Sequence, residues 1–514
     1  MSEPGQASGV VEETGSGRAK RLGFSALLWQ GSTLVSTLTS IVLALVIARL
    51  RGPDWYGNLT TYLFISGVGA TIGAMGIPNT LAKYVSELKG SANRHATALF
   101  SRKQIKAATR SGLVAAFGVL AVMALLFLGK GYDDVPSLVV IALSVPITIL
   151  SSSATQLSVG LQDFKSVLVA TVVSKAFLVV VGLTVVLLNF PLFVYLSVLT
   201  TSIAIGAILQ FRASRIFRSE KDTGILPEDV ESRAKSYGRA LWINSVLDLA
   251  VWQQSGVFFL WLFVGSNYAG QFSIAYTLTY VLIGLLSGSI VSSLFPEFSK
   301  LHGGGDAQRG HSTFRVGFKA NTLLVAPVAT FLVLGGSSLA AILFGAEFDQ
   351  AGEVIFLLAI SSGFVAIGGL ATSFGYAQDK HFSWMKIALA SSVLAIVLFL
   401  VMVPLMGLLG AVIVQASVQV LGISIVLYVV AARMKVQIPW RHCCIVVGSA
   451  AASYLATYLV FGLVFTGTVF LLIWGALGSI VYLFLVLALS GYDQDTSMIL
   501  KTAKTMLKTI MRLS

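Results

Sequence analysis

The sequence predicts an all-α integral membrane protein of about fourteen transmembrane helices. The 514 residues are 56% hydrophobic and only 11% charged, whereas an average globular domain carries about 25% charged residues. Apolar stretches of about 20 residues, the length that crosses a bilayer, recur along the whole chain. The two halves of the chain also resemble each other. These patterns predict two parallel six-helix repeats followed by two extra C-terminal helices.

The predicted spans follow one another with short connections. Only Pro404 to Gly407 separates the eleventh span from the twelfth. The fourteen stretches cover residues 24–48, 58–80, 111–129, 137–160, 166–188, 192–211, 240–264, 271–295, 320–344, 354–376, 387–404, 408–431, 443–465 and 468–490.

The positions of Lys and Arg predict the orientation. The chain contains 35 of these residues. With the N-terminus inside, only Arg49, Arg51 and Lys130 fall on outer segments, Lys175 falls within a span, and all others lie on the inner side. Inner loops of membrane proteins retain positive charge. We therefore expect a multi-pass protein of the cell membrane with both termini in the cytoplasm.

This topology divides the chain into six segments. The inner residues 83–110 carry seven basic side chains and one acid, Glu87, which predicts an amphipathic helix against anionic headgroups. The segments are a disordered cytoplasmic tail (1–20), an N-terminal six-helix bundle (21–212), a cytoplasmic linker (213–239), a C-terminal six-helix bundle (240–432), helices 13 and 14 (433–492) and a cytoplasmic amphipathic tail (493–514).

The two halves align at an offset of 213 residues. Trp29 falls on Trp242, and Pro191-Leu192 falls on Pro404-Leu405. Loop positions match as well: Gly52 and Gly57 fall on Gly265 and Gly270. Because each repeat holds an even number of helices, both copies enter and leave on the same side, and the axis that relates them lies along the membrane normal. Such a protein can rock one half against the other around a central cleft.

Three motifs resemble the polysaccharide flippases of the multidrug/oligosaccharidyl-lipid/polysaccharide exporter superfamily. The first runs from Ala48 to Gly57, with Arg51 where the family usually has Leu; the second runs from Met75 to Glu87; the third is Phe344 to Phe348. The resemblance covers roughly residues 20–490. It implies a flippase that moves a polyprenyl-phosphate-linked or diphosphate-linked saccharide from the inner to the outer leaflet. Its partners would be this lipid-linked saccharide, membrane lipid and glycan-assembly enzymes, and we expect a monomer.

Two ionisable residues lie deep within spans. Lys175 is nine residues beyond Ser166, and Asp248 is nine beyond Arg239, which places each about 14 Å into a core of about 30 Å. Such residues usually mark pathways or partners. The functional interpretation assigns a substrate phosphate to Lys175 and a coupling cation, Na⁺ or H⁺, to Asp248. Alternatively, Lys175 extends toward the headgroups while Asp248 is hydrogen-bonded between helices, or the two form a pair.

Polar neighbours at helical spacing extend the candidate cleft. Asn244, Trp252 and Ser255 share one helix face with Asp248, and Gln30 lies nine residues into the first span. Gln415 and Gln419 are more simply explained as hydrogen-bonding residues between helices.

Other functions fit the sequence less well. A cation-coupled multidrug exporter of the same superfamily is the alternative, and Asp248 keeps it open. A membrane enzyme would need a large loop or domain with clustered acids, and no such segment exists in the sequence. No catalytic set, metal-ligand spacing or phosphate-binding motif is visible, so we expect no metal and no cofactor beyond a coupling cation. Membrane topology explains the net charge of +13 without nucleic acid.

Overall fold

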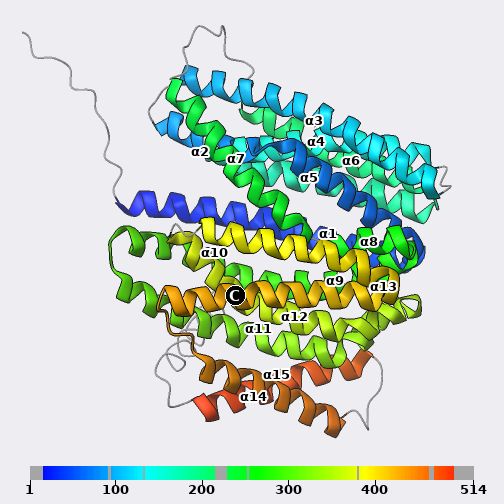
Figure 1. Cartoon of the computed structure of the whole chain (residues 1–514), viewed down its shortest axis with the longest axis vertical. Helices are drawn as coiled ribbons and strands as arrows, with labels where there is room; N and C mark the ends of the chain where they lie inside the picture. Colours follow the sequence, from blue (N-terminus) through cyan, green and yellow to red (C-terminus); the bar gives the residue numbers. More distant parts are fainter. Residues whose placement is uncertain are drawn as a thin grey trace, which may run out of the picture. The chain divides into compact units, whose positions relative to one another are not determined.

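The fold is entirely helical in the described part of the chain (Figure 1). A computed structural model describes residues 15–90, 94–130, 134–214, 228–251, 254–378, 381–461 and 468–490. Ten helices within these ranges are long and apolar enough to cross a membrane. The elements are α1 (Gly15–Ala74), α2 (Ile77–Gly90), α3 (Arg94–Lys130), α4 (Val135–Gly160), α5 (Phe164–Leu187), α6 (Leu192–Ser214), α7 (Glu228–Val251), α8 (Ser255–Phe263), α9 (Ser266–Tyr276), η2 (Thr277–Val281), α10 (Leu282–Gly303), α11 (Ala307–Phe344), η3 (Ala346–Phe348), α12 (Asp349–Ala377), α13 (His381–Arg433), α14 (Trp440–Phe461) and α15 (Thr468–Ser490).

The difference between ten long helices and fourteen predicted spans has a simple origin. α1 bends at Gly52 and α13 bends at Gly407, where the backbone φ angles are 73° and 57°. Only glycine adopts such angles without strain, so at each of these glycines one helix ends and the next begins. Each long element therefore contains two predicted spans. The predicted span 240–264 instead falls on two elements, α7 and α8. The last predicted span, 468–490, falls on α15, whose apolar stretch Ile473–Leu489 is shorter than the ten long helices. The predicted all-α membrane fold is thus confirmed.

The chain divides into two compact units whose boundaries do not coincide with the sequence repeats. One unit holds residues up to Ala44 together with Gly69–Trp242. The other holds Leu45–Val68 together with the residues from Ile243 onward. The bend of α1 at Gly52 therefore belongs to the second unit, although it lies in the first repeat. The predicted bundle boundaries at 21–212 and 240–432 stay a prediction.

In the first unit, α2, α3, α4 and α7 share one apolar cluster. Its centre includes Tyr84 of α2, Phe100 of α3 and Val230 of α7, which are at most 4% exposed. The sequence predicted one amphipathic surface helix over residues 83–110, and this prediction is wrong. The described residues of this segment fall on α2 and α3. Most of its apolar side chains pack in the cluster that α7 completes, and α7 begins at Glu228, inside the predicted linker.

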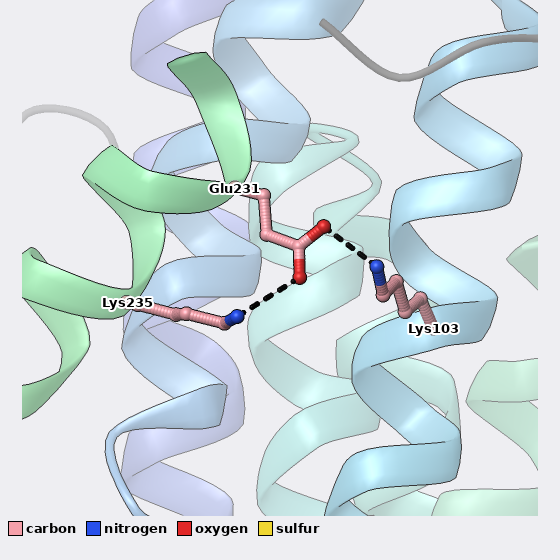
Figure 2. Close-up of polar contacts among 3 residues, drawn as sticks. All are labelled: Lys103, Glu231 and Lys235. Carbon is pink, nitrogen blue, oxygen red and sulfur yellow. Dashed lines mark hydrogen bonds and ion pairs between the residues drawn. The ribbon is translucent and has the colours of Figure 1, made fainter. Parts of the chain in front are cut away.

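Ion pairs join the start of α7 to α2 and α3. Glu231 accepts hydrogen bonds from Lys103 at 2.6 Å and from Lys235 at 3.1 Å (Figure 2). Arg233 pairs with Glu87 of α2 at 2.7 Å. The hydrogen bonds from Lys103, and then from Lys235, lower the pKa of the Glu231 carboxyl below its usual value. The start of α7 is thus attached to the first unit by charge as well as by apolar contact.

In the second unit, α14 and α15 lie side by side next to α11 (Figure 1). Trp474 of α15 is fully buried, its ring packs 5.2 Å from that of Phe331 in α11, and its Nε1 donates to the carbonyl oxygen of Tyr454 in α14 at 2.9 Å. A large aromatic ring with its N–H satisfied contributes much apolar contact without leaving a buried donor unpaired. One tryptophan therefore joins both additional helices to the second repeat.

Candidate functional site

Two repeat-related glycines end one helical segment and allow the next to begin. Gly52 has φ 73° and ψ 176°, and Gly265, its repeat mate, has φ 145° and ψ 168°. Gly345, in the third family motif, has φ 97° and ψ 172°. These angles are costly for any residue with a Cβ atom. Glycine at these positions is therefore required by the backbone of three sharp reversals.

A second pair of repeat mates, Gly57 and Gly270, brings two of these reversals into backbone contact. A Cβ atom on Gly57 would overlap the carbonyl oxygen of Ser266, and a Cβ atom on Gly270 would overlap the carbonyl oxygen of Pro53. Pro53 and Ser266 are also repeat mates. The contact therefore has local two-fold symmetry, as an interface between equivalent segments requires.

Polar side chains extend this contact. Asp54 accepts a hydrogen bond from Ser266 Oγ at 2.7 Å and one from the amide of its own repeat mate, Asn267, at 3.3 Å. Trp261 Nε1 donates to Asn58 Oδ1 at 2.8 Å. Residues separated by more than 200 positions are thereby fixed against each other through both backbone and side chains.

The third family motif, Phe344 to Phe348, lies beside the contact between Gly57 and Gly270. Arg49 donates to the carbonyl oxygen of Ile342 at 3.1 Å, and a Cβ atom on Gly52 would lie 2.7 Å from Glu347 Oε2. Gln271 donates to the carbonyl oxygen of Glu347 at 2.7 Å. We call the five glycines that converge here, Gly52, Gly57, Gly265, Gly270 and Gly345, the glycine junction.

A separate cavity of about 320 Å³ lies in the second unit beside Asp248. Asn244, one helical turn earlier, donates from Nδ2 to Asp248 Oδ2 at 3.2 Å, and the Tyr376 hydroxyl lies 3.5 Å from Asn244 Oδ1. The cavity is also lined by Thr372, Tyr376, Trp384 and Ser391. A carboxylate with amide and hydroxyl oxygens nearby offers the ligands that a hard cation or a proton takes.

The other predicted residues are placed as follows. Lys175 is half-buried on α5, and Gln30 is exposed on α1; both belong to the first unit. Ser255 begins α8 and is buried, and Trp252 lies outside the described residues. Because Lys175 and Asp248 belong to different units, their facing one common cleft stays a prediction.

Sequence reasoning did not find Tyr376 and Trp384, the aromatic residues beside Asp248. They lie near the adjoining ends of α12 and α13, more than 120 positions along the chain from Asp248. Their aromatic character is ordinary for a membrane helix, so the sequence carried no signal that they would line the cavity. The hydrogen bond between Asn244 and Asp248, by contrast, was predictable from their spacing of four residues.

The chain is a multi-pass membrane protein by its long apolar helices. It belongs to the polysaccharide biosynthesis protein family, whose model matches residues 25–302.

Several solved structures of transporters share the fold of this chain. A lipid II flippase, MurJ, in an inward closed conformation has a TM-score of 0.66 and 14% identity, over 90% of this chain and 99% of its own. A multidrug resistance MATE family transporter of the MOP superfamily, in an inward-facing conformation, has a TM-score of 0.64 and 14% identity, over 78% of this chain and 94% of its own. A MOP superfamily transporter from Pyrococcus furiosus Vc1 has a TM-score of 0.53 and 12% identity, over 81% of this chain and 95% of its own. No curated protein sequence matches the chain.

Proposed function

We propose that this protein flips a polyprenyl-phosphate-linked or diphosphate-linked saccharide from the inner to the outer leaflet of the cell membrane. The observation that carries the proposal is the match to the polysaccharide biosynthesis protein family over residues 25–302. The fold shared with a lipid II flippase supports it. Saccharide units built on a lipid carrier in the cytoplasm are too polar to cross a bilayer core unaided, so a family that serves polysaccharide synthesis needs such a step.

The mechanism proposed is alternating access between the two repeats. In this proposal the glycine junction forms the closed outer end of the pathway, because Arg49 and Asp54 belong to predicted outer loops. The backbone contact between Gly57 and Gly270 separates when the pathway opens outward. Hydrogen bonds from Ser266 and Asn267 to the Asp54 carboxylate contribute at most about 1.5–3 kcal/mol each. An interface of this kind closes firmly and still opens within a transport cycle.

Lys175 and Asp248 have separate roles in the proposal. Lys175 binds the phosphate of the substrate, because an ammonium group is a compact partner for one. Asp248, within its cavity of about 320 Å³, binds a coupling cation, Na⁺ or H⁺. Both termini are cytoplasmic, and the basic segments at 83–110 and 212–239 remain on the inner side. A cysteine introduced at position 221 is then inaccessible to impermeant reagents in intact cells; labelling from outside would overturn this orientation.

The alternative is a cation-coupled multidrug exporter. The cavity beside Asp248 favours it, since it joins a carboxylate to the aromatic side chains of Tyr376 and Trp384, a combination that also suits an organic cation. A deletion strain separates the two functions. Loss of surface glycan with unchanged drug sensitivity supports the flippase. Increased sensitivity to cationic drugs with normal surface glycan supports the exporter and overturns the flippase.

A further inference from the structure

A groove of about 450 Å³ lies in the first unit between the end of α1 and α3. Its walls are mostly apolar, and Val114 and Met75 in its lining are 72% and 57% exposed. Arg110 is the charged residue in its lining. The groove is distinct from the cavity beside Asp248 and shares no residue with the glycine junction.

The groove exists because α1 and α3 touch and then separate. A Cβ atom on Gly73 would lie 2.6 Å from that of Ala115, and one on Gly69 would lie 2.5 Å from Val119 Cγ2. The helices are therefore in close contact over these two turns. α1 ends immediately afterwards, because Met75 and Gly76 adopt φ angles of 49° and 75°. The groove is lined on this side by Ile72, Gly73 and Met75.

The charges around the groove are of one sign. Arg110 and Lys106 are exposed and lie one turn apart on the same face of α3. Within the described residues neither makes an ion pair, whereas Lys103 on the same helix binds Glu231. Glu87, the single acid between residues 83 and 110, is paired with Arg233. The apolar groove between α1 and α3 therefore lies next to two cations, Lys106 and Arg110. Neither has an acidic partner in the described part of the chain.

We propose that this groove binds one anionic glycerophospholipid, with an acyl chain along Ile72 and Val114 and the phosphate at Arg110 and Lys106. The two parts of the groove match the two parts of such a lipid: apolar walls where α3 enters the membrane, and positive charge at the basic end of the same helix. Basic residues at a membrane boundary attract anionic headgroups, and a guanidinium binds a phosphate through two parallel hydrogen bonds. A zwitterionic lipid fits the slot equally well but lacks the net charge. The proposal rests on the membrane fold and not on the substrate assigned above.

Native mass spectrometry of the purified full chain tests the site. The protein is taken from micelles that contain phosphatidylglycerol and phosphatidylcholine in equal amounts, and the lipids retained are counted. We expect wild type to retain one phosphatidylglycerol in preference to phosphatidylcholine. Arg110→Gln with Lys106→Gln should lower that retention about tenfold. Ala107→Phe, which fills the groove from an exposed position and keeps both cations, should lower it as well.

Lys165→Gln is the matched control, because Lys165 is also exposed near a helix end but does not line this groove. This variant should retain the lipid like wild type. Unfolding temperatures near that of wild type confirm that each variant is folded. Wild-type retention in either groove variant, or equal loss in Lys165→Gln, overturns the proposal. Displacement of phosphatidylglycerol by an equimolar polyprenyl phosphate also overturns it, since the groove would then take the substrate's own lipid.

Discussion

Gly57 and Gly270 occupy equivalent positions of the two repeats and lie in backbone contact, each against the carbonyl oxygen of the residue four positions before the other. This relationship explains why glycine recurs at both places at an offset of 213 residues. It also brings two distant parts of the family match to a single location, because the motif from Ala48 to Gly57 packs directly on residues 265–271. The repeat is thus preserved where the two copies meet.

Substitution of the junction glycines should destabilise the protein. Gly57→Ala or Gly270→Ala forces a methyl group into a backbone carbonyl oxygen, which side-chain adjustment cannot relieve, and such overpacking costs about 1–3 kcal/mol. Thermal unfolding of the purified protein measures the loss. Gly67→Ala is the matched control in the same helix, because a Cβ atom there meets nothing within 4 Å. Equal unfolding temperatures for Gly57→Ala and Gly67→Ala would show that the contact is absent in solution.

The hydrogen bond between Asp54 and Asn267 allows an exchange experiment. Asn267→Asp alone places two carboxylates about 3.3 Å apart, so we expect a lower unfolding temperature. Adding Asp54→Asn restores one amide and one carboxylate, and the amide oxygen introduced at position 54 still accepts from Ser266. The double variant should therefore recover most of the loss. Failure of the second substitution to recover any stability argues against the local two-fold contact.

The ion pairs of Glu231 should make the attachment of α7 sensitive to acid. Because the pKa of Glu231 is lowered in the folded protein, its contribution is complete above the unfolded pKa near 4.5 and is lost as pH falls through the folded pKa. The pair is partly exposed, so we expect a contribution of at most about 1 kcal/mol. Glu231→Gln should reduce the loss of unfolding free energy that occurs on acidification below about pH 4.5 by that amount.

Charge reversal provides the control for this pair. Lys103→Glu should destabilise by placing two carboxylates together, and Lys103→Glu with Glu231→Lys should recover stability. Lys165→Glu, at a site without an ion pair in the described residues, should have little effect. If Glu231→Gln unfolds with the same pH profile as wild type, the hydrogen bonds in Figure 2 do not contribute in solution.

The two deep charges should respond to substitution in different ways. If Lys175 binds a phosphate, Lys175→Ala should abolish transport at normal abundance, whereas Lys175→Arg should retain part of it because the charge is kept. If Asp248 carries the coupling ion, Asp248→Asn should give transport that no longer responds to the ion gradient. Unchanged transport in both Lys175→Ala and Asp248→Ala would refute both roles. Recovery of unstable single variants by the double neutral variant would show a structural pair instead.

The sequence predicted the spans well because each is a long apolar run, and the structure preserves almost all of them as helices or as halves of bent helices. Gly52 and Gly407, where the backbone leaves the helical conformation, both lie between predicted spans. The sequence did not predict that α7 begins at Glu228, because the polar start of that helix is buried against α2 and α3 through Val230 and Ala234 rather than against lipid. The cavity beside Asp248 depends on Tyr376 and Trp384, whose proximity arises only from packing.

The leaflet position of the lipid-linked saccharide tests the central claim most directly. Inverted and right-side-out membrane vesicles from wild type and a deletion strain are probed with an impermeant lectin against the host's lipid-linked glycan. We predict that deletion leaves the glycan on the cytoplasmic leaflet, that the wild-type gene restores it to the outer leaflet, and that Lys175→Ala does not. An unchanged outer-leaflet pool in the deletion strain, with no second family member in the host, would contradict the account.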